Sequence, residues 1–158
     1  MLTEDQLRAV KRYSSAEFSK INGALRKGLR LSRDIRATVD ALDDAISNST
    51  CDSEVIVYRG VGQRYAEALI ASNPDVGDII EDAGYLSTSA KRDVAGEFAK
   101  YEPPGMMMRI KLPKGCNALY LAPYSVYPAE EEWLLPRSAE LRILGYDDDT
   151  RTLELELV

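Results

Sequence analysis

Two glutamates with one residue between them stand directly before an apolar run, in the segment YPAEEEWLLPR. Alternation along a strand puts Glu130 and Glu132 on one face and Glu131 on the other. Two carboxylates on one face repel each other, and a protein keeps such a pair mainly where negative charge is needed. A glycosidase uses such a pair as acid and nucleophile. Taken alone, the three glutamates are more simply interpreted as a solvated acidic loop.

Three hydroxyl side chains follow one another in the segment GYLSTSA. Along a strand, Ser87 and Ser89 point to one face and Thr88 to the other. The chain contains no histidine that could deprotonate a serine. These residues are therefore poor nucleophiles and are better suited to orienting a neighbouring carboxylate. On their own, they also fit an ordinary polar strand edge.

An arginine closes the apolar run VIVY and precedes a Gly-x-Gly turn formed by Gly60 and Gly62. In that position Arg59 can present a planar, bidentate donor to a phosphate or carboxylate in a cleft. The simpler alternative is an arginine that extends from a strand end into solvent.

Composition restricts the chemistry further. The absence of histidine excludes Ser-His-Asp and Cys-His catalysis as well as histidine-based zinc sites. Cys51 and Cys116 lack the spacing of metal ligands, which favours two reduced thiols over a disulfide. We expect no metal, and reactions carried out by carboxylates, hydroxyls and cations. The net charge of −6, with scattered basic residues, makes nucleic acid a less favoured partner.

The chain also lacks the segments that would direct it to a membrane. Its apolar runs are only a few residues long, so none is expected to span a bilayer. The start MLTEDQLRAV lacks the apolar stretch of a signal peptide, so export would need another carrier.

Helices are expected in the first part of the chain. Thr3 and Gln6 form a capping-box pattern, and Ser14 with Glu17 repeats it, which predicts two helix starts. Apolar residues at helical spacing predict a third helix: Ile35, Val39, Leu42 and Ile46.

From residue 55 onward, short apolar runs bounded by Gly, Pro and Asp predict strands. The expected strands are Val55–Tyr58, Tyr85–Ser89, Met106–Leu112, Asn117–Leu121 and Glu132–Leu135, with a short helix at Tyr65–Ala71 and a hairpin around Asp147–Asp149. Helices followed by strands predict an α+β fold. We expect a single domain over residues 1–158, helical over 1–50 and mainly β over 51–158.

The order of these motifs resembles the Arg–Ser–Glu class of mono-ADP-ribosyltransferases. This class includes the binary actin-modifying and C3-like bacterial exoenzymes, phage transferases and polymorphic-toxin effectors. The resemblance extends from Tyr13 to Ile143. It implies N-terminal helices packed on a two-sheet mixed β-sandwich core of the ADP-ribosyltransferase type, with NAD bound in a cleft between the sheets.

The segment YSSAEFSKINGALR resembles the family's first NAD-facing helix. By that match Tyr13, Asn22 and Arg26 approach the phosphates or ribose of the cofactor. Phe18 stands where many relatives carry a second tyrosine. Arg59, with Gly60 beside it, is expected to hold NAD through its phosphates or the adjacent ribose.

The resemblance also assigns roles in breaking the nicotinamide–ribose bond of NAD, whose transition state is oxocarbenium-like. Glu132 accepts a hydrogen bond from a ribose hydroxyl and places negative charge beside the developing cation. Ser87 holds Glu132 in position, while Thr88 and Ser89 support the strand and the nicotinamide end. The expected catalytic residues are Arg59, Ser87, Glu130 and Glu132.

Glu130 is expected to act on the acceptor, because a carboxylate can bind an arginine guanidinium and take its proton. Family members that modify asparagine usually carry Gln at this position, so Glu130 favours an arginine of a protein. The loop Ala122–Ala129, with Tyr124 and Tyr127, corresponds to the acceptor-recognising segment, and Lys100–Gly105 to a cover over the nicotinamide.

The function implied is that of a secreted bacterial or phage toxin or effector domain, delivered into a target cell without a signal peptide of its own. It would modify a target protein in the cytoplasm of a target cell, and a neutralising immunity protein would protect its producer. Three alternatives stay open. The same fold can act on nucleic acid, a small molecule or water; it can bind NAD without turnover; or the glutamate pair can serve a glycosidase.

Overall fold

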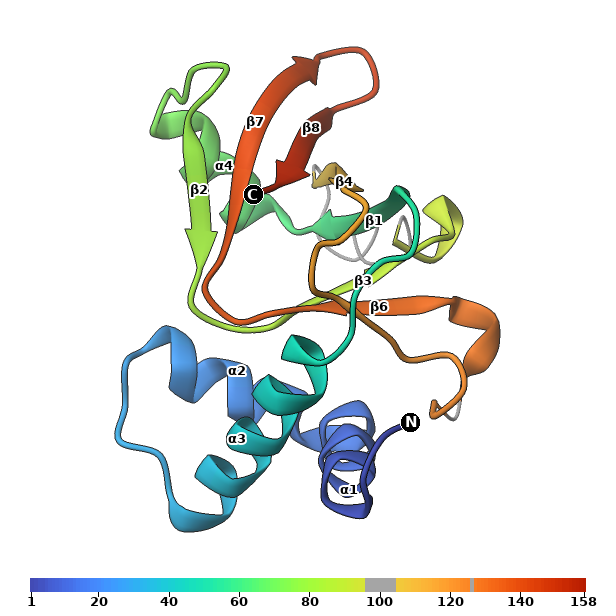
Figure 1. Ribbon diagram of the computed structural model, residues 1–158. Coiled ribbons are helices and arrows are strands. Elements are labelled where there is room, and N and C mark those ends of the chain that lie inside the picture. Colours follow the sequence, from blue (N-terminus) through green and yellow to red (C-terminus); the bar gives the residue numbers. More distant parts are fainter. Residues whose placement is uncertain (96–104, 126) are drawn as a thin grey trace.

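The computed structural model describes residues 1–95, 105–125 and 127–158 (Figure 1). Helices come first and strands follow, which confirms the α+β prediction. The helical part comprises α1 (Glu4–Arg12), the π-helical segment η1 (Tyr13–Glu17), α2 (Phe18–Arg26) and α3 (Arg33–Ser47). In the described residues, no helix is long and apolar enough to cross a membrane.

The second part of the chain is mainly strand. Its elements are β1 (Val55–Val61), α4 (Gln63–Ala71), β2 (Ile79–Asp82), β3 (Leu86–Ser89), β4 (Met106–Leu112), β5 (Leu119–Tyr120), the 3-10 helix η2 (Pro128–Glu130), β6 (Glu132–Leu135), β7 (Ala139–Asp147) and β8 (Thr152–Leu157). Most of the predicted strands are confirmed within a few residues, and β7 with β8 forms the predicted hairpin.

The strands pair in the order β2-β7-β8-β4-β1-β3-β6-β5. Only β4 and β8 run parallel among the described pairs. The two-sheet detail of the prediction is not confirmed, because these ladders form one eight-stranded sheet. The link between β1 and β3 is nevertheless narrow, since it consists of the single register pair Tyr58 and Ser89 in the described residues. A five-stranded part and a three-stranded part therefore meet at this pair.

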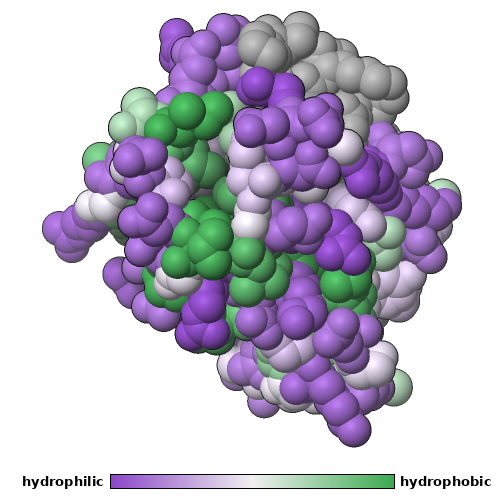
Figure 2. Space-filling model, turned by 90° about the horizontal axis from the view of Figure 1, so that it is seen from above, coloured by the Kyte–Doolittle hydropathy of each residue, from purple (hydrophilic) through white to green (hydrophobic). Residues whose placement is uncertain are grey.

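The buried side chains form two cores. Most of the first consists of side chains of β1, β4, β7 and β8, with Val57, Met108 and Leu155 among them, and β3 and β6 add Leu86 and Leu135. The helices pack on the three-stranded part through the second, which includes Ile21 and Leu134. Figure 1 shows α1, α2 and α3 gathered on one side of β6, while β2, β7 and β8 stand on the other. Seen from that other end, apolar side chains occupy the middle of the surface and hydrophilic ones surround them (Figure 2).

Only the first of the two predicted capping boxes is present. Gln6 N donates to Thr3 Oγ1 at 3.2 Å, and Thr3 N donates to Gln6 Oε1 at 3.0 Å. The predicted helix start at Ser14 is wrong, because the backbone there stays helical instead of extended. Glu17 pairs with Arg12 at 2.8 Å rather than returning to Ser14. The chain instead passes through the π-helical turn η1, a feature that is frequent at functional sites.

Strand β1 is longer than predicted. It continues through Gly60 and Val61, which pair with Met107 and Met106 of β4. Arg59 is therefore inside the strand rather than at its end, and the turn begins only at Gly62, the residue before α4.

The two cysteines lie opposite each other, although 65 positions separate them in the sequence. Both are free thiols, as the sequence favoured, and their Sγ atoms are 3.5 Å apart. Burial, followed by the neighbouring Cys51, raises the pKa of Cys116 to about 12.

Candidate active site

A cleft of about 540 Å³ lies between the N-terminal helices, the strands β1 and β3, and the glutamate segment. Every residue predicted for catalysis or cofactor binding lines it: Tyr13, Asn22, Arg26, Arg59, Gly60, Ser87, Thr88, Ser89, Glu130 and Glu132. Segments that are far apart in the sequence thus meet in one place.

Strand β3 holds the glutamate segment through its backbone and its hydroxyl groups. Ser89 is the register partner of Glu132. Its hydroxyl donates to the main-chain oxygen of Glu130, and Thr88 Oγ1 donates to the main-chain oxygen of Trp133 at 2.8 Å. Thr88 and Ser89 therefore tie β3 to the glutamate segment.

Glu132 is the first residue of β6 and is half-buried. Burial, and then the charge of Glu130, raises the pKa of Glu132 to about 7. A hydrogen bond from Ser87 acts in the opposite direction and lowers this pKa. A carboxyl whose pKa is displaced by burial and by a like charge is typical of functional sites.

The two glutamates of the pair share the cleft, but strand alternation is not the reason. Glu130 ends the 3-10 helix η2, and Glu131 adopts the left-handed conformation with φ 47° and ψ 51°. Of the three glutamates, only Glu132 belongs to β6. Glu131 does not line the cleft, as predicted. The cause is this left-handed turn and not the alternation of side chains along a strand.

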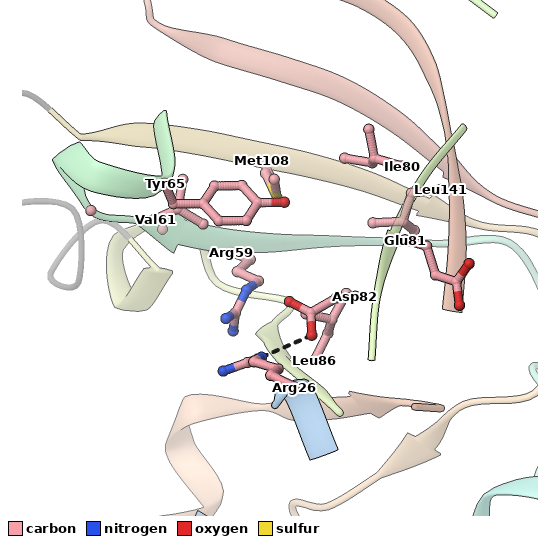
Figure 3. Close-up of a pocket in the computed structure, with 12 residues that line it drawn as sticks. Arg26, Arg59, Val61, Tyr65, Ile80, Glu81, Asp82, Leu86, Met108 and Leu141 are labelled. Atoms are coloured by element: carbon pink, nitrogen blue, oxygen red, sulfur yellow. Dashed lines mark hydrogen bonds and ion pairs between the residues drawn. The ribbon is translucent and has the colours of Figure 1, made fainter. Parts of the chain in front are cut away.

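Two arginines form a cationic end of the cleft. Arg59 Nη1 donates to the main-chain oxygen of Ser87 at 3.0 Å. Arg26 Nε donates to Asp82 Oδ1 at 2.8 Å, and Figure 3 shows both guanidinium groups close together beside this carboxylate. Burial, and then the charge of Arg26, lowers the pKa of Arg59, while Asp82 acts in the opposite direction. Two cations held close together provide a site for an anion.

A second hollow of about 580 Å³ adjoins the first at the two arginines (Figure 3). Arg26, Arg59 and Gly60 line both hollows. Tyr65 and Asp82 line only the second. The sequence analysis missed Asp82, because its partner Arg26 is 56 positions away and neither residue belongs to a local pattern that joins them.

Tyr13 and Asn22 are both buried and contact the protein at the edge of the cleft. Asn22 Nδ2 donates to Tyr13 Oη at 3.0 Å, and the Tyr13 and Ser87 hydroxyl oxygens are 3.1 Å apart. Burial raises the pKa of Tyr13, so its hydroxyl stays protonated.

The aromatic residues predicted around the site differ in exposure. Tyr127 is 65% exposed and lines the cleft. Tyr124 packs against the helical core and braces the loop. Phe18 is 46% exposed and also lines the cleft. The predicted cover at Lys100–Gly105 lies outside the described residues except for its last position.

In the described residues, no group of three or more Asp, Glu, Cys or His side chains is placed to hold a metal ion. The comparison with known families is specific. The family described as ADP-ribosyltransferase exoenzyme matches residues 1–156. This chain belongs to that family. The match covers both the helical part and the sheet, so it includes every residue of the candidate site described above.

A curated relative of this exoenzyme family is the NAD(+)--arginine ADP-ribosyltransferase EFV of Enterococcus faecalis (strain ATCC 700802 / V583). It is 28% identical over 148 residues, which cover 90% of this chain and 29% of that protein. The chain thus spans less than a third of the length of the curated relative it matches.

Solved exoenzyme structures have the same fold. Plx2a, an ADP-ribosyltransferase toxin from Paenibacillus larvae, is 26% identical with a TM-score of 0.81, over 99% of this chain and 87% of that one. C3stau2 from S. aureus, solved with NAD, is 25% identical with a TM-score of 0.79, over 99% of this chain and 86% of that one.

Proposed function

We propose that this chain is the catalytic domain of a mono-ADP-ribosyltransferase toxin or effector that cleaves NAD and transfers ADP-ribose to an arginine of a target protein. The observation that carries the proposal is the joint presence of Arg59, Ser87 and Glu132 on one cleft. Membership of the exoenzyme family supports the reaction, and the name of the Enterococcus faecalis relative supports arginine as acceptor.

The cationic end of the cleft suits the diphosphate of NAD. Burial, and then the charge of Arg26, lowers the pKa of Arg59, so the two cations repel each other. An anion between two such guanidinium groups relieves this repulsion and accepts their hydrogen bonds. Arg59 and Arg26, with Gly60 between the two hollows, are therefore the residues that would hold the diphosphate.

The carboxylate end of the cleft suits the reacting part of NAD. Bound NAD supplies the nicotinamide–ribose bond that breaks. Glu132 would place a negative charge where positive charge develops on the ribose, and Ser87 would donate a hydrogen bond to this carboxylate. A half-buried carboxylate stabilises a cation more strongly than a fully hydrated one does.

Glu130 would serve the acceptor. It lines the same cleft as Glu132, and its charge is close enough to raise the pKa of Glu132. A carboxylate in this position can bind a guanidinium and take its proton during attack. The exposed ring of Tyr127 would contact the target protein beside it. Action in the cytoplasm of a target cell and a neutralising immunity protein in the producer belong to the same proposal.

The test follows the label from biotin-NAD. The purified domain is incubated with biotin-NAD and cell lysate, and the labelled molecules are identified by mass spectrometry. We expect ADP-ribose on arginine of a protein, and no label with Glu132→Ala. Label on nucleic acid would show that nucleic acid is the acceptor, and free ADP-ribose alone would show that water is the acceptor. Either result would contradict transfer to arginine. No NAD cleavage above the Glu132→Ala control would reject the catalytic function.

A further inference from the structure

A line of hydrogen bonds runs from the protein core to the Ser87 hydroxyl, beside the candidate catalytic carboxylate. Its members are the main-chain N–H of Tyr85, the Asn22 amide, the Tyr13 hydroxyl and the Ser87 hydroxyl. Ser87 and Glu132 lie on the same face of neighbouring strands, because the register partner of Glu132 is Ser89, two positions from Ser87. We propose that Tyr13 and Asn22 are positioning residues, which fix the direction of the Ser87 hydroxyl so that its proton points at Glu132. The inference rests on the proposed function, because it gives Glu132 its working geometry.

The direction of this line is set by its first member. The main-chain N–H of Tyr85 can only donate, and Asn22 Oδ1 accepts its hydrogen bond at 2.9 Å. The amide of Asn22 is therefore oriented, and its Nδ2 must be the atom that faces Tyr13. Nδ2 donates to Tyr13 Oη at 3.0 Å, because an amide nitrogen cannot accept.

The same reasoning passes along the two hydroxyl groups. Since Tyr13 Oη accepts from Asn22, its own proton is free to be donated to Ser87 Oγ, 3.1 Å away. In the proposed arrangement Ser87 Oγ accepts from Tyr13, which leaves the Ser87 proton for the Glu132 carboxylate on the same face of the sheet. Each donation polarises the next hydroxyl, so the bond to Glu132 is strengthened by the two before it.

Burial keeps water from replacing these partners. Tyr13 is 1% exposed and Asn22 is 6% exposed. The Tyr13 ring packs edge-on against the Tyr85 ring, with centroids 5.7 Å apart. Gly84 completes the arrangement, because a Cβ at this position would lie only 3.0 Å from Asn22 Oδ1. The turn before β3 can approach the asparagine this closely only without a side chain.

Two tyrosines of the same core provide a matched pair of variants. Tyr13→Phe removes the hydroxyl that donates to Ser87, while Tyr85→Phe removes one that donates to Asp43, on the helical side and away from the cleft. The main-chain N–H of residue 85 is kept in the second variant. Each variant loses the two hydrogen bonds of one tyrosine hydroxyl, so the pair separates the loss of the relay from a general loss of stability.

The primary readout is the titration of Glu132 by NMR of 13C-labelled glutamate carboxyls, with the signal assigned by its disappearance in Glu132→Gln. The other charged groups that line the cleft are Glu130 on η2, Arg59 on β1 and Arg26 on α2, and all three remain in every variant. We expect Tyr13→Phe to raise the pKa of Glu132 by about half a unit or more, because the hydrogen bond from Ser87 weakens. Tyr85→Phe should leave this pKa in place.

A cycle with Ser87→Ala tests whether Tyr13 acts through the serine. In the Ser87→Ala background, Tyr13→Phe should shift the Glu132 titration no further. In turnover of NAD, Tyr13→Phe should lower kcat about threefold to tenfold with little change in KM.

An unmoved Glu132 titration in Tyr13→Phe, or an equal shift in Tyr85→Phe, would overturn the inference. A rise in KM alone would instead make Tyr13 a contact of NAD, which also contradicts it. Because NMR needs no turnover, a wild-type chain that fails to cleave NAD would reject the proposed function and leave this result readable.

Discussion

Arg59 Nη1 donates a hydrogen bond of 3.0 Å to the main-chain oxygen of Ser87. The bond crosses from β1 to β3 beside the pair Tyr58 and Ser89, where the five-stranded and three-stranded parts of the sheet meet. Arg59 therefore links the cationic end of the cleft to the strand that carries the hydroxyl groups. One side chain thus reaches both the proposed diphosphate site and the strand that carries the serine.

Replacing Arg59 with lysine should expose both roles. Lysine keeps a positive charge but lacks the planar guanidinium group, whose several N–H donors can bind a phosphate and the main-chain oxygen of Ser87 at the same time. For Arg59→Lys we expect KM for NAD to rise about tenfold and the free energy of unfolding to fall by about 1 kcal/mol. Steady-state kinetics and thermal melts measure the two effects.

Arg109→Lys is the matched control, because Arg109 pairs with Glu154 on the outside of the neighbouring strands. Both members of this pair are exposed by more than a third, and exposed pairs contribute little to stability. Equal effects of the two substitutions would contradict the special role of Arg59.

NAD cleavage should depend on pH through Glu132. Its pKa is raised to about 7, and the proposed role needs the carboxylate. The rate should therefore rise with pH through about 7, and at one unit below the pKa only about a tenth of the molecules carry the charge. A pH–rate profile of kcat measures this limb. A rate that stays flat from about pH 5 to 8 would show that the titrating group is not needed for cleavage.

Glu132 should also make the fold less stable at high pH. Its pKa in the folded state lies above the ordinary value of 4.5, so the folded state holds the proton more tightly than the unfolded chain does. The stability from this group is complete below the ordinary value and is lost as the pH rises through about 7. Glu132→Gln should therefore raise the unfolding free energy by on the order of 2 kcal/mol at about pH 8, and by little at about pH 4. Thermal melts at both pH values test the sign; a variant less stable than the wild type at the higher pH would contradict it.

The sequence predicted those features whose causes are local. Thr3 and Gln6 are three positions apart and form their capping box by themselves. Apolar runs located most of the strands, and the motif order led to a set of residues that the fold does bring to one cleft. The second capping box failed because a residue outside the pattern, Arg12, binds Glu17.

Other features depend on contacts between distant segments. The C-terminal end of β1 is set by its pairing with β4, because the pairing continues through Gly60 and Val61. The turn at Glu131 requires a left-handed backbone conformation, which a run of three glutamates does not predict. Asp82 becomes part of the site only because the turn before β3 packs against α2.

Gly84 should be needed for this packing. A Cβ there would lie 3.0 Å from both Arg26 Nε and Asn22 Oδ1, so one of the two side chains must move. Arg26 is held by Asp82, and Asn22 is held by Tyr13 and Tyr85. For Gly84→Ala we expect a loss of about 1–3 kcal/mol in stability and a severalfold rise in KM for NAD. Gly145→Ala is the control, because its Cβ would meet nothing within 4 Å and Gly145 lines neither hollow. A Gly84→Ala protein as stable and as active as the control would mean that the turn can move at no cost.

Glu130 should separate transfer from hydrolysis. Its carboxylate lines the cleft beside Glu132, whereas the neighbouring Glu131 does not line it. If Glu130 binds and deprotonates the acceptor guanidinium, Glu130→Ala should lower transfer to arginine by about a hundredfold or more and retain NAD hydrolysis. Glu131→Ala, which keeps an L-residue at the left-handed position, should retain both activities. The measurements are agmatine labelling for transfer and nicotinamide release for hydrolysis.

Because Glu130 also raises the pKa of Glu132, its removal should move the pH dependence of the remaining hydrolysis to lower pH. Equal loss of both activities in Glu130→Ala would contradict this division of labour and would make Glu130 part of the NAD-cleaving step.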